Sequence, residues 1–538
     1  MSTPWREDEG NFWLTLGKKA CFCGAEVVDF FHSLPTANPM HLSLATSPRP
    51  TVRGIVLALF QDVAPAKHPW FAFLPVGAKQ TILAFAKAKE FEGKSGEVHV
   101  IPYGSPVRRV VLLGLGVQKD WNRRKATLAS RQVVVVAKQH KITDVAVRLD
   151  DLQFTTVGTE LLAQLVAENA HLADYNFNRY RKVPKGGWPK LSSFVLHVRP
   201  ADKTAAASGI RVGAIIGNAN NMARDLANTP GSDMTPTLLA DAAVAEGKKF
   251  GFSVTVMKKD AIEREGMGGL LGVSQGSPHP PTFTIMEYAA PGHAKDKPVV
   301  FVGKGVTFDS GGLNVKPDTA MYEMHMDMSG AAAVIATVRT IAQLKLSIRV
   351  IGLIPAAENM SAGDAYRPGD QLRTLSGKTI EVMHTDAEGR VILADALTYA
   401  ERYKPSVVID VATLTGAAMV ALGQRAAAIL SPQEDFSQQL HKLAEESGDL
   451  AWPLPLWEEY EADIQGTFGD VANSSKVRYG GAITGAAFLW QFAKKFSRWA
   501  HLDIAPTMTT IDGQFLAKGS AGAGVRLLVA YARSHATA

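Results

Sequence analysis

The alternation of short apolar runs with helical stretches beyond residue 298 is the feature that most constrains the fold of this chain. Strand-like runs lie at Val299–Val302, Ile348–Ile354, Thr379–His384 and Val407–Val411. Helical stretches lie between or after them, at Ala331–Leu344 and Ile392–Tyr399. This order predicts a mainly parallel sheet with helices on both faces. Ligands of such sheets bind beyond the carboxyl ends of the strands, where several polar residues of this sequence fall.

The part of the chain before about Pro200 has the pattern of a mixed α/β unit. Its strand-like runs are Val52–Phe60, Val98–Ile101, Val110–Gly114 and Ser193–Val198, and its helical stretches include Lys79–Lys87 and Ala126–Gln139. The sequence GLGVQK after one apolar run lacks the third glycine of a dinucleotide-binding fingerprint. A plain turn from strand to loop is therefore expected there.

The two parts meet at a polar, proline-containing segment, Arg199–Lys203, which is followed by a predicted helix over Thr204–Leu226. We therefore expect an α/β fold of two domains. The first is an N-terminal mixed α/β domain over residues 1–203, with a role in assembly or regulation. The second is a larger catalytic domain over residues 204–538. The length of 538 residues agrees, because a single hydrophobic core stops growing at about 250–300 residues.

The composition is that of a soluble globular enzyme, with 46% hydrophobic and 20% charged residues. The 57 basic and 51 acidic residues leave a net charge of +6, a small excess that gives a nucleic-acid partner little support. No apolar run reaches the ~18 residues of a membrane span, and Glu7, Asp8 and Glu9 argue against a targeting peptide. Cys21 and Cys23 are too close for an ordinary disulfide, so we expect free thiols in a reducing compartment. The sequence predicts a cytoplasmic protein.

Seven charged residues stand in glycine-rich surroundings between positions 304 and 390. They are Lys304, Asp309 and Lys316 in VGKGVTFDSGGLNVKP, Asp327 in MHMDMSGAAAV, and Asp386, Glu388 and Arg390 in HTDAEGR. Asp386 and Glu388 are separated by one residue, so in extended backbone they would point to the same side. The pair Gly311 and Gly312 after Asp309 lets the chain turn sharply and approach a ligand closely.

Four acids in one place raise one another's pKa and oppose ionisation unless cations compensate for them. Two divalent ions would balance the four carboxylates, and oxygen-rich ligation suits Zn²⁺, Mn²⁺, Mg²⁺ or Co²⁺. Two such ions can clamp and activate a bridging water for attack on a carbonyl group. The alternative is that these acids are helix caps and solvated loop charges, a reading that fits single residues better than all four together.

The same segments resemble the leucine aminopeptidase family of cytosolic metallopeptidases. HTDAEGR is similar to the NTDAEGR signature of that family, and the likeness extends to VGKGVTFDSGGLNVKP, DMSGAAAV, ATLTGA, LPLWEEY and WAHLDIA. These motifs run in order from about Asn218 to Leu528, whereas the first domain matches only loosely. The resemblance implies a two-metal exopeptidase that hydrolyses N-terminal, preferably leucine-like, residues from peptides. It also implies a homohexamer.

The resemblance further implies which residues bind the metals. Asp309, Asp386 and Glu388 would hold the more exchangeable ion, and Lys304, Asp309, Asp327 and Glu388 the tighter one. Lys304 can ligate only as a neutral amine, so we expect the metal and burial to drive its pKa far below ~10.4. A solvated Lys304 is the alternative.

Lys316 and Arg390 are candidates for stabilising negative charge that develops on the tetrahedral intermediate. The resemblance implies that Arg390 also holds a bicarbonate ion together with the backbone of Ala387, Gly389 and Leu414. That ion would act as general base on the bridging water, since no side chain in the motifs is an obvious base. The alternative for Arg390 is a surface ion pair.

The family's first side-chain pocket maps onto Met324, Thr413, Gly416, Ala505 and Met508. Methionines and small residues there would form an adaptable apolar pocket that suits leucine-like side chains. Three positions depart from the common pattern: His384 replaces Asn, Ser329 replaces Gly, and Pro506 stands where Gly is typical. We expect a structural or supporting role for His384. Pro506 and Thr507 leave the shape of the pocket open.

Two other functions compete with a peptidase. A catalytically silent scaffold or DNA-binding protein could use the same fold, but the complete set of charged residues argues against silence, and the small charge excess argues against DNA. A salt-dependent mobility-shift titration would separate these readings. A two-metal phosphoesterase is disfavoured because such sites usually include histidine ligands and a lysine ligand would be unusual for them.

Overall fold

The computed structural model describes residues 40–104, 108–155 and 157–536. The predicted free thiols Cys21 and Cys23, and the acidic residues near the start of the chain, lie outside these residues. Within the described ranges, no helix combines the length and apolar character needed to cross a bilayer.

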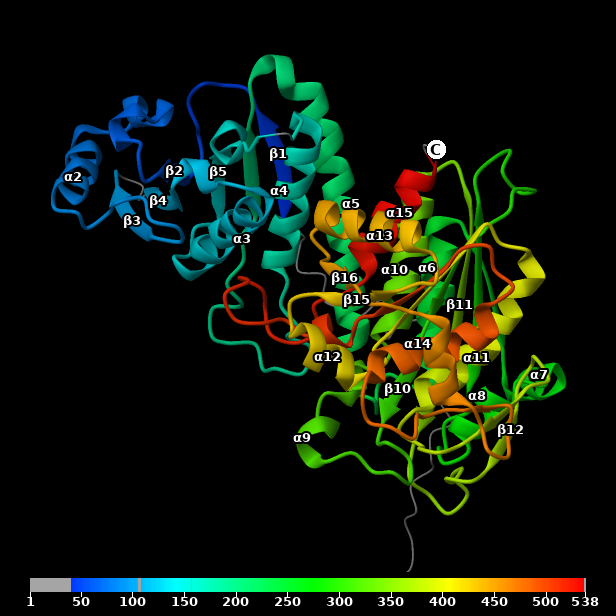
Figure 1. Ribbon diagram of the computed structural model, residues 1–538. Coiled ribbons are helices and arrows are strands. Elements are labelled where there is room, and N and C mark those ends of the chain that lie inside the picture. The colour runs from blue at the N-terminus through cyan, green and yellow to red at the C-terminus, as the bar shows by residue number, and fades with distance from the viewer. Residues whose placement is uncertain (1–39, 105–107, 156, 537–538) are drawn as a thin grey trace, which may run out of the picture. The chain divides into compact units, whose positions relative to one another are not determined.

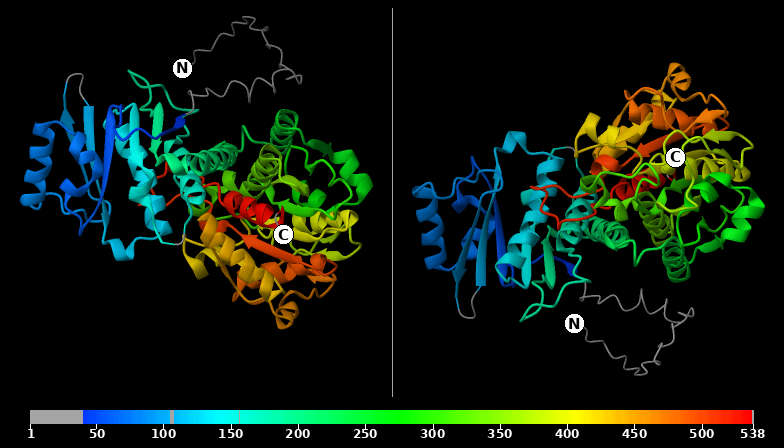
Figure 2. Two further views of the ribbon diagram at one scale, coloured as in Figure 1. Left: turned by 90° about the horizontal axis from the view of Figure 1, so that it is seen from above. Right: turned by 90° about the horizontal axis from the view of Figure 1, so that it is seen from below.

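The first part of the chain forms a six-stranded sheet in the order β1-β6-β5-β2-β4-β3. Its strands are β1 (His41–Ala45), β2 (Gly54–Phe60), β3 (Val98–Tyr103), β4 (Arg108–Gly116), β5 (Asp144–Arg148) and β6 (Ser193–His197). Neighbouring strands of this sheet pair in parallel, except that β3 and β4 pair antiparallel. The accompanying helices are α2 (Val76–Lys87), α3 (Arg123–Gln139) and α4 (Thr159–Asp174). In Figures 1 and 2 the blue and cyan strands form this sheet.

Alternating residues of these strands pack into two cores, one on each face of the sheet. On β4, Val111 and Leu113 pack with α3 and α4, whereas Val110 and Leu112 pack with α2. Such alternation is expected of strands whose side chains point to opposite faces in turn.

The second part of the chain forms a nine-stranded sheet in the order β16-β15-β18-β14-β9-β11-β8-β7, with β10 paired to β11. Its strands are β7 (Ser253–Met257), β8 (Thr282–Ala289), β9 (Val299–Gly303), β10 (Gly305–Asp309), β11 (Arg349–Asn359), β14 (Val407–Ala412), β15 (Ala427–Leu430), β16 (Ala451–Pro453) and β18 (Trp499–Asp503). The central strands β18, β14, β9 and β11 are parallel to one another. Strands β12 (Gln371–Arg373), β13 (Thr379–Glu381) and β17 (Val471–Ala472) form a small separate sheet.

Helices cover both faces of the nine-stranded sheet (Figure 1). The helices of this part are α5 (Lys203–Asn228), α6 (Pro236–Phe250), α7 (Lys259–Glu265), α8 (Gly268–Ser274), α9 (Asp318–Met321), α10 (Ser329–Leu344), α11 (Glu388–Ala400), α12 (Gly416–Leu422), α13 (Glu434–Ser447), α14 (Gly481–Ala493) and α15 (Val525–Ala536). Val300 and Val302 of β9 belong to the core made with α8, α11 and α14, while the alternate residues Val299 and Phe301 lie outside that core. The mainly parallel α/β fold predicted from the sequence is confirmed.

The predicted strands and helices are confirmed, with differences around HTDAEGR. The strand predicted over Thr379–His384 ends at Glu381 and belongs to the small separate sheet instead of the mainly parallel one. The helix predicted from Ile392 begins at Glu388. The apolar pattern reveals the helix only from its second turn, because charged residues occupy the first turn. Strand β10, which the sequence did not indicate, ends at Asp309.

The carboxyl ends of the parallel strands gather polar side chains at one edge of the sheet. Lys304 follows β9, Asp309 ends β10, Asn359 ends β11, Thr413 follows β14 and Asp503 ends β18. Because these strands run in the same direction, their ends meet, as expected for an open parallel sheet.

Gly330 allows the start of α10 to lie against β14 at this edge. A Cβ at Gly330 would lie 2.1 Å from the carbonyl oxygen of Val411 and 2.9 Å from the amide nitrogen of Lys304. Both atoms belong to backbone and cannot rotate away, so any side chain here would push α10 from the sheet.

We predict that Gly330→Ala lowers the free energy of unfolding by about 1–3 kcal/mol through overpacking, although alanine favours a helix by about 1 kcal/mol. The control is Gly77→Ala in α2, where a Cβ meets nothing within 4 Å and helix propensity alone should act. Urea unfolding of both variants measures the difference. A Gly330→Ala protein as stable as the Gly77→Ala protein would contradict the close approach.

Candidate metal centre

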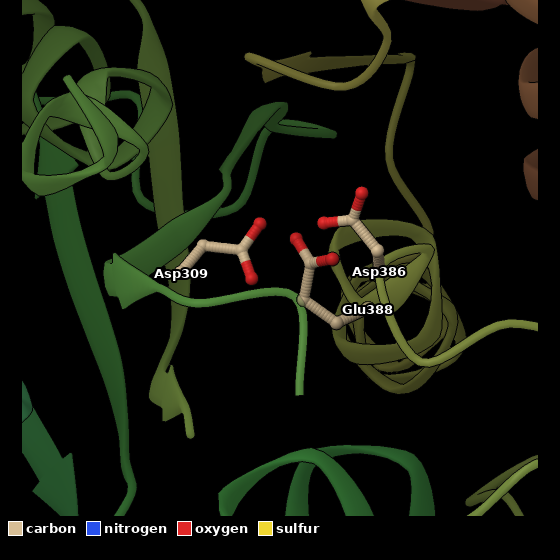
Figure 3. A group of neighbouring side chains, drawn as sticks. All are labelled: Asp309, Asp386 and Glu388. Carbon is tan, nitrogen blue, oxygen red and sulfur yellow. The ribbon is translucent and has the colours of Figure 1, made fainter. Parts of the chain in front are cut away.

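Three carboxylates converge at the sheet edge. Asp309, Asp386 and Glu388 each offer an oxygen, and these oxygens lie within 4.8 Å of one another. Asp309 comes from the end of β10, Asp386 from the loop before α11, and Glu388 from the first residue of that helix (Figure 3). Asp309 and Glu388 are buried, and Asp386 is partly exposed. The structure therefore brings together the three residues that the sequence assigned to one metal.

The route by which Asp386 and Glu388 approach each other differs from the sequence prediction. The prediction of extended backbone is wrong, because Asp386 lies in a turn and Glu388 already belongs to α11. In that turn the amide of Ala387 donates to the carbonyl of His384. The amide of Asp386 also donates to His384 Nδ1, at 3.2 Å.

Lys304 is buried between Asp327, the fourth acid of the cluster, and Glu388. Its Nζ is 2.7 Å from Asp327 Oδ2 and 2.8 Å from Glu388 Oε1, and it donates to the carbonyl of Thr413 at 3.0 Å. The side chain passes over Gly389, where a Cβ would lie 2.5 Å from Lys304 Cε. The alternative that Lys304, Asp327 and the other buried acids are solvated loop charges is wrong.

Lys316 bridges the outer side of the cluster. Its Nζ lies 2.7 Å from Asp309 Oδ2 and also contacts Asp386 Oδ1. Its position depends on the turn after Asp309, where Gly311 and Gly312 have φ values of +89° and +65°. The sharp glycine turn predicted from the sequence is confirmed, since these left-handed values favour glycine.

Burial and like charges shift the pKa values of the acids upward. Burial, with the neighbouring Glu388 charge, raises the pKa of Asp309 to about 7. Burial, with Glu388 and Asp309, raises that of Asp327 to about 7 despite Lys304. Burial also raises the pKa of Asp386. For Glu388 burial acts in the same direction, but Lys304 and Lys316 outweigh it and lower the pKa.

The protein groups hold Lys304 in its charged form. Burial alone lowers the pKa of Lys304, as the sequence led us to expect, but Asp327 and Glu388 outweigh burial and raise it. Any lowering of this pKa must therefore come from a cation that takes over those carboxylates.

The donor set suits divalent cations. Carboxylate oxygens are ligands that Mg²⁺, Mn²⁺ and Zn²⁺ all accept, and a deprotonated amine adds a nitrogen donor. Glu388 contacts Lys304 and Asp309 contacts Lys316, while the oxygens of these two acids lie within 4.8 Å of each other. The residues present therefore fit a two-metal centre.

Arg390 and the start of α11 provide a second, positively polarised region beside the acids. Arg390 is buried and donates from Nη1 to the carbonyl of Asn473 at 3.0 Å, while Nε has no partner among the described residues. Burial lowers its pKa, which nearby acids raise in part. The N-cap residue Ala387 makes no side-chain hydrogen bond to the start of α11, where the helix dipole is positive. The alternative of a surface ion pair for Arg390 is wrong.

The residues expected to line the first side-chain pocket lie on three segments. Thr413 follows β14 and donates to Asp327 Oδ1 at 2.6 Å. Ala505 and Met508 are buried at a 3₁₀ turn, Ala505–Thr507, which contacts α12 and hence the helix that Gly416 begins. Met324 starts a second 3₁₀ turn just before Asp327 and is partly buried.

The three unusual positions have local structural contacts. His384 accepts from the amide of Asp386, and burial lowers its pKa. Ser329 donates to the carbonyl of Met326 at 2.6 Å at the start of α10. Pro506 is buried within the 3₁₀ turn after β18.

Several buried polar residues that the sequence reasoning missed support the cluster. They are Asn359, Tyr366, Thr385, Asn473 and Asp503. Asp503 accepts from the amide of Leu414 and the hydroxyl of Thr415, and thereby holds the loop that contacts Lys304. For Asp503 a signal was available, because it ends an apolar strand run at the ligand-binding edge, whereas Asn359 lies five residues beyond the predicted strand Ile348–Ile354.

Comparison with known proteins identifies relatives over most of the chain. The profile of the cytosol aminopeptidase family matches with its N-terminal domain at residues 40–184 and its catalytic domain at residues 221–529. A "Probable cytosol aminopeptidase" of Chlorobium limicola is 42% identical over 460 residues, covering 82% of this chain and 90% of that protein. One of an Azoarcus species is 39% identical over 509 residues, covering 93% and 99%.

A solved structure shares the fold. The bottromycin maturation enzyme BotP in complex with Mn aligns with a TM-score of 0.79 at 31% identity. The alignment covers 90% of this chain and 100% of that one.

Replacing Gly389 with alanine tests whether the close approach of Lys304 to Gly389 positions its amine for metal binding. The new Cβ would lie 2.5 Å from Lys304 Cε and 2.8 Å from Nζ, while Asp327 and Glu388 restrict where the amine can move. We predict that Gly389→Ala weakens Mn²⁺ binding about tenfold or more, as displaced ligands do. Its melting temperature should not fall correspondingly, since alanine favours a helix by about 1 kcal/mol.

Titration calorimetry with Mn²⁺ measures this effect, with Gly363→Ala as control because a Cβ there meets nothing within 4 Å. Equal Mn²⁺ affinity in the Gly389→Ala and Gly363→Ala proteins would refute the role of this close approach in positioning Lys304.

Proposed function

Since this chain belongs to the cytosol aminopeptidase family and is a metal-dependent aminopeptidase, we propose that it hydrolyses leucine-like N-terminal residues from peptides at the cluster around Lys304. The observation that carries the proposal is the convergence of Asp309, Asp386 and Glu388 within 4.8 Å, beside a buried lysine. Charged groups are concentrated and buried in this way where they perform chemistry or bind ions.

Five side chains would hold two divalent cations, of the kind Zn²⁺, Mn²⁺, Mg²⁺ or Co²⁺. Asp309, Asp386 and Glu388 form the more open position, consistent with the partial exposure of Asp386. Lys304 and Asp327 complete the deeper position with Asp309 and Glu388, consistent with their burial. When bound, two such cations supply an activated water and polarise the scissile carbonyl.

The protein's own groups would orient the substrate and stabilise charge. A free α-amine of the peptide would bind near Asp327, which restricts cleavage to the first residue. Lys316 would act in its protonated form beside Asp309 and Asp386, because Asp309, with Glu388, Asp327 and Asp386, outweighs the effect of burial and raises its pKa. Its charge would then stabilise the negative oxygen of the tetrahedral intermediate.

Arg390 would bind a bicarbonate ion together with the backbone of Ala387, Gly389 and Leu414, and the ion would supply the general base. Three features support this. The guanidinium is buried, its Nε lacks a protein partner among the described residues, and the uncapped start of α11 favours an anion.

Thr413, Gly416, Ala505, Met324 and Met508 would bind the first side chain. Ala505 and Met508 are buried near α12, and methionine adapts to apolar side chains of varied shape. Pro506 and Thr507 would restrict the backbone conformation on this side of the pocket.

We propose further that the protein is a cytoplasmic homohexamer with domains at residues 1–203 and 204–538. Resemblance to the family supports the hexamer, and the two family profiles fall on either side of the domain boundary.

Glu388→Gln is the central test of the metal site. The change removes the charge that faces Lys304 at nearly constant volume. We predict that kcat/KM for leucyl-anilide falls by about 10³-fold, or about 4 kcal/mol, together with loss of bound metal. The matched control is Glu358→Gln, a buried acid of β11 that contacts Ser277 outside the cluster. Near-normal turnover with full metal content in Glu388→Gln would refute the site.

Arg390→Ala tests charge stabilisation in the transition state. We predict that kcat falls by about 10²–10³-fold, because a preorganised donor is lost, while KM changes little. Steady-state kinetics on leucyl-anilide separate the two constants, and Arg390→Lys should retain more turnover by keeping the charge. A change confined to KM would assign Arg390 to substrate binding instead.

A further inference from the structure

Asn359 is a fully buried amide at the end of β11, directly beside the cluster. Its Nδ2 donates to Asp309 Oδ1 at 2.8 Å and to the carbonyl of Thr385 at 3.0 Å. It therefore joins the loop that follows β10 to the loop that carries Asp386.

The orientation of this amide is fixed by its partners. A carboxylate oxygen and a carbonyl oxygen both accept and cannot donate, so the nitrogen of Asn359 must face them. In this orientation Oδ1 has no donor among the described residues. A buried acceptor without a partner costs free energy, so the position of Asn359 is explained by what its nitrogen does.

The contact determines how Asp309 presents its two oxygens. Oδ1 receives two N–H groups, from Asn359 and from the amide of Gly311 at 2.9 Å. Oδ2 faces Lys316, on the side of the other acids. The terminal torsion of an aspartate is broad and has little preference of its own, so these two donors select the rotation of the carboxylate.

A second side chain also holds the loop that carries Asp386, whereas Asn359 is the one side chain among the described residues that donates to Asp309 Oδ1. The carbonyl of Thr385 also accepts from the hydroxyl of Tyr366 at 2.6 Å. Within the part of the chain that the structure describes, Tyr366 donates to Thr385 and not to Asp309, so it can hold the loop when Asn359 does not. The two functions of Asn359 can therefore be separated by mutation.

We infer that Asn359 is a positioning residue for the metal centre: by occupying Asp309 Oδ1 it leaves Oδ2 as the oxygen that this carboxylate offers to cations. The inference rests on the proposed role of Asp309 as a metal ligand. Asn359 itself touches neither the substrate nor the cations.

The test compares Asn359→Leu with Tyr366→Phe. Leucine has nearly the same shape as asparagine but donates no hydrogen bond, whereas Tyr366→Phe removes only the loop tie. We predict that Asn359→Leu weakens Mn²⁺ binding about 10–100-fold by titration calorimetry, as the loss of such supporting contacts does. Tyr366→Phe should bind Mn²⁺ within about twofold of the wild type. If Asn359→Leu does not fold, Asn359→Ala takes its place, since alanine also donates no side-chain hydrogen bond, and the same weakening is expected.

Asp309→Asn in the same series tests the premise. If Asp309→Asn retains Mn²⁺, the proposed metal site is wrong. If Asp309→Asn loses Mn²⁺ but Asn359→Leu binds it as the wild type does, only the positioning role is overturned. Equal weakening in Asn359→Leu and Tyr366→Phe would likewise overturn it, because the effect would then come from the loop tie.

Discussion

The concentration of negative charge at one sheet edge is the constraint on which the rest of the site depends. Asp309, Asp327 and Glu388 are buried almost completely, and Asp386 stands beside them. Burial of these carboxylates, together with the repulsion between them, raises the pKa values of Asp309 and Asp327 to about 7. Lys304 and Lys316 compensate in part, each by bridging two acids. Two ammonium groups cannot neutralise four carboxylates, so the arrangement favours binding of additional cations.

The fold meets this constraint by bringing rigid elements closer than side chains normally permit. The parallel strands β9 and β10 place Lys304 and Asp309 at or just past their ends, and β14 places there Thr413, which donates to Asp327. Gly330 admits α10 against the backbone of β14, and Gly389 admits the side chain of Lys304 against α11. Asp309 and Glu388 are thus held at the end of a strand and the start of a helix. This explains why like charges can remain close without the local structure opening.

The sequence was sufficient to predict the mainly parallel α/β architecture and the membership of the charged cluster, because strand ends and glycine pairs are local signals, but it did not indicate strand β10. It was not sufficient for the path of HTDAEGR. Asp386 and Glu388 converge through a turn and a helix start, and the apolar pattern becomes helical only after those residues. Asn359 was missed for a different reason. Its importance lies in a contact to Asp309 across 50 positions of the sequence, which periodicity and spacing do not encode.

Glu388 differs from the other three acids in the direction of its pKa shift. Burial acts to raise the pKa of all four, yet Glu388 alone among them has a lowered pKa, because there the charges of Lys304 and Lys316, with the hydrogen bond from Lys304, outweigh burial. It also begins α11, where the helix dipole favours a negative charge. Glu388 is therefore the acid that stays ionised most readily. It lies where two halves of the cluster meet: the inner half of Lys304 and Asp327, and the outer half of Asp309, Asp386 and Lys316. A cation that approaches either half meets this charge, while Asp309 and Asp327 become fully ionised as positive charge enters.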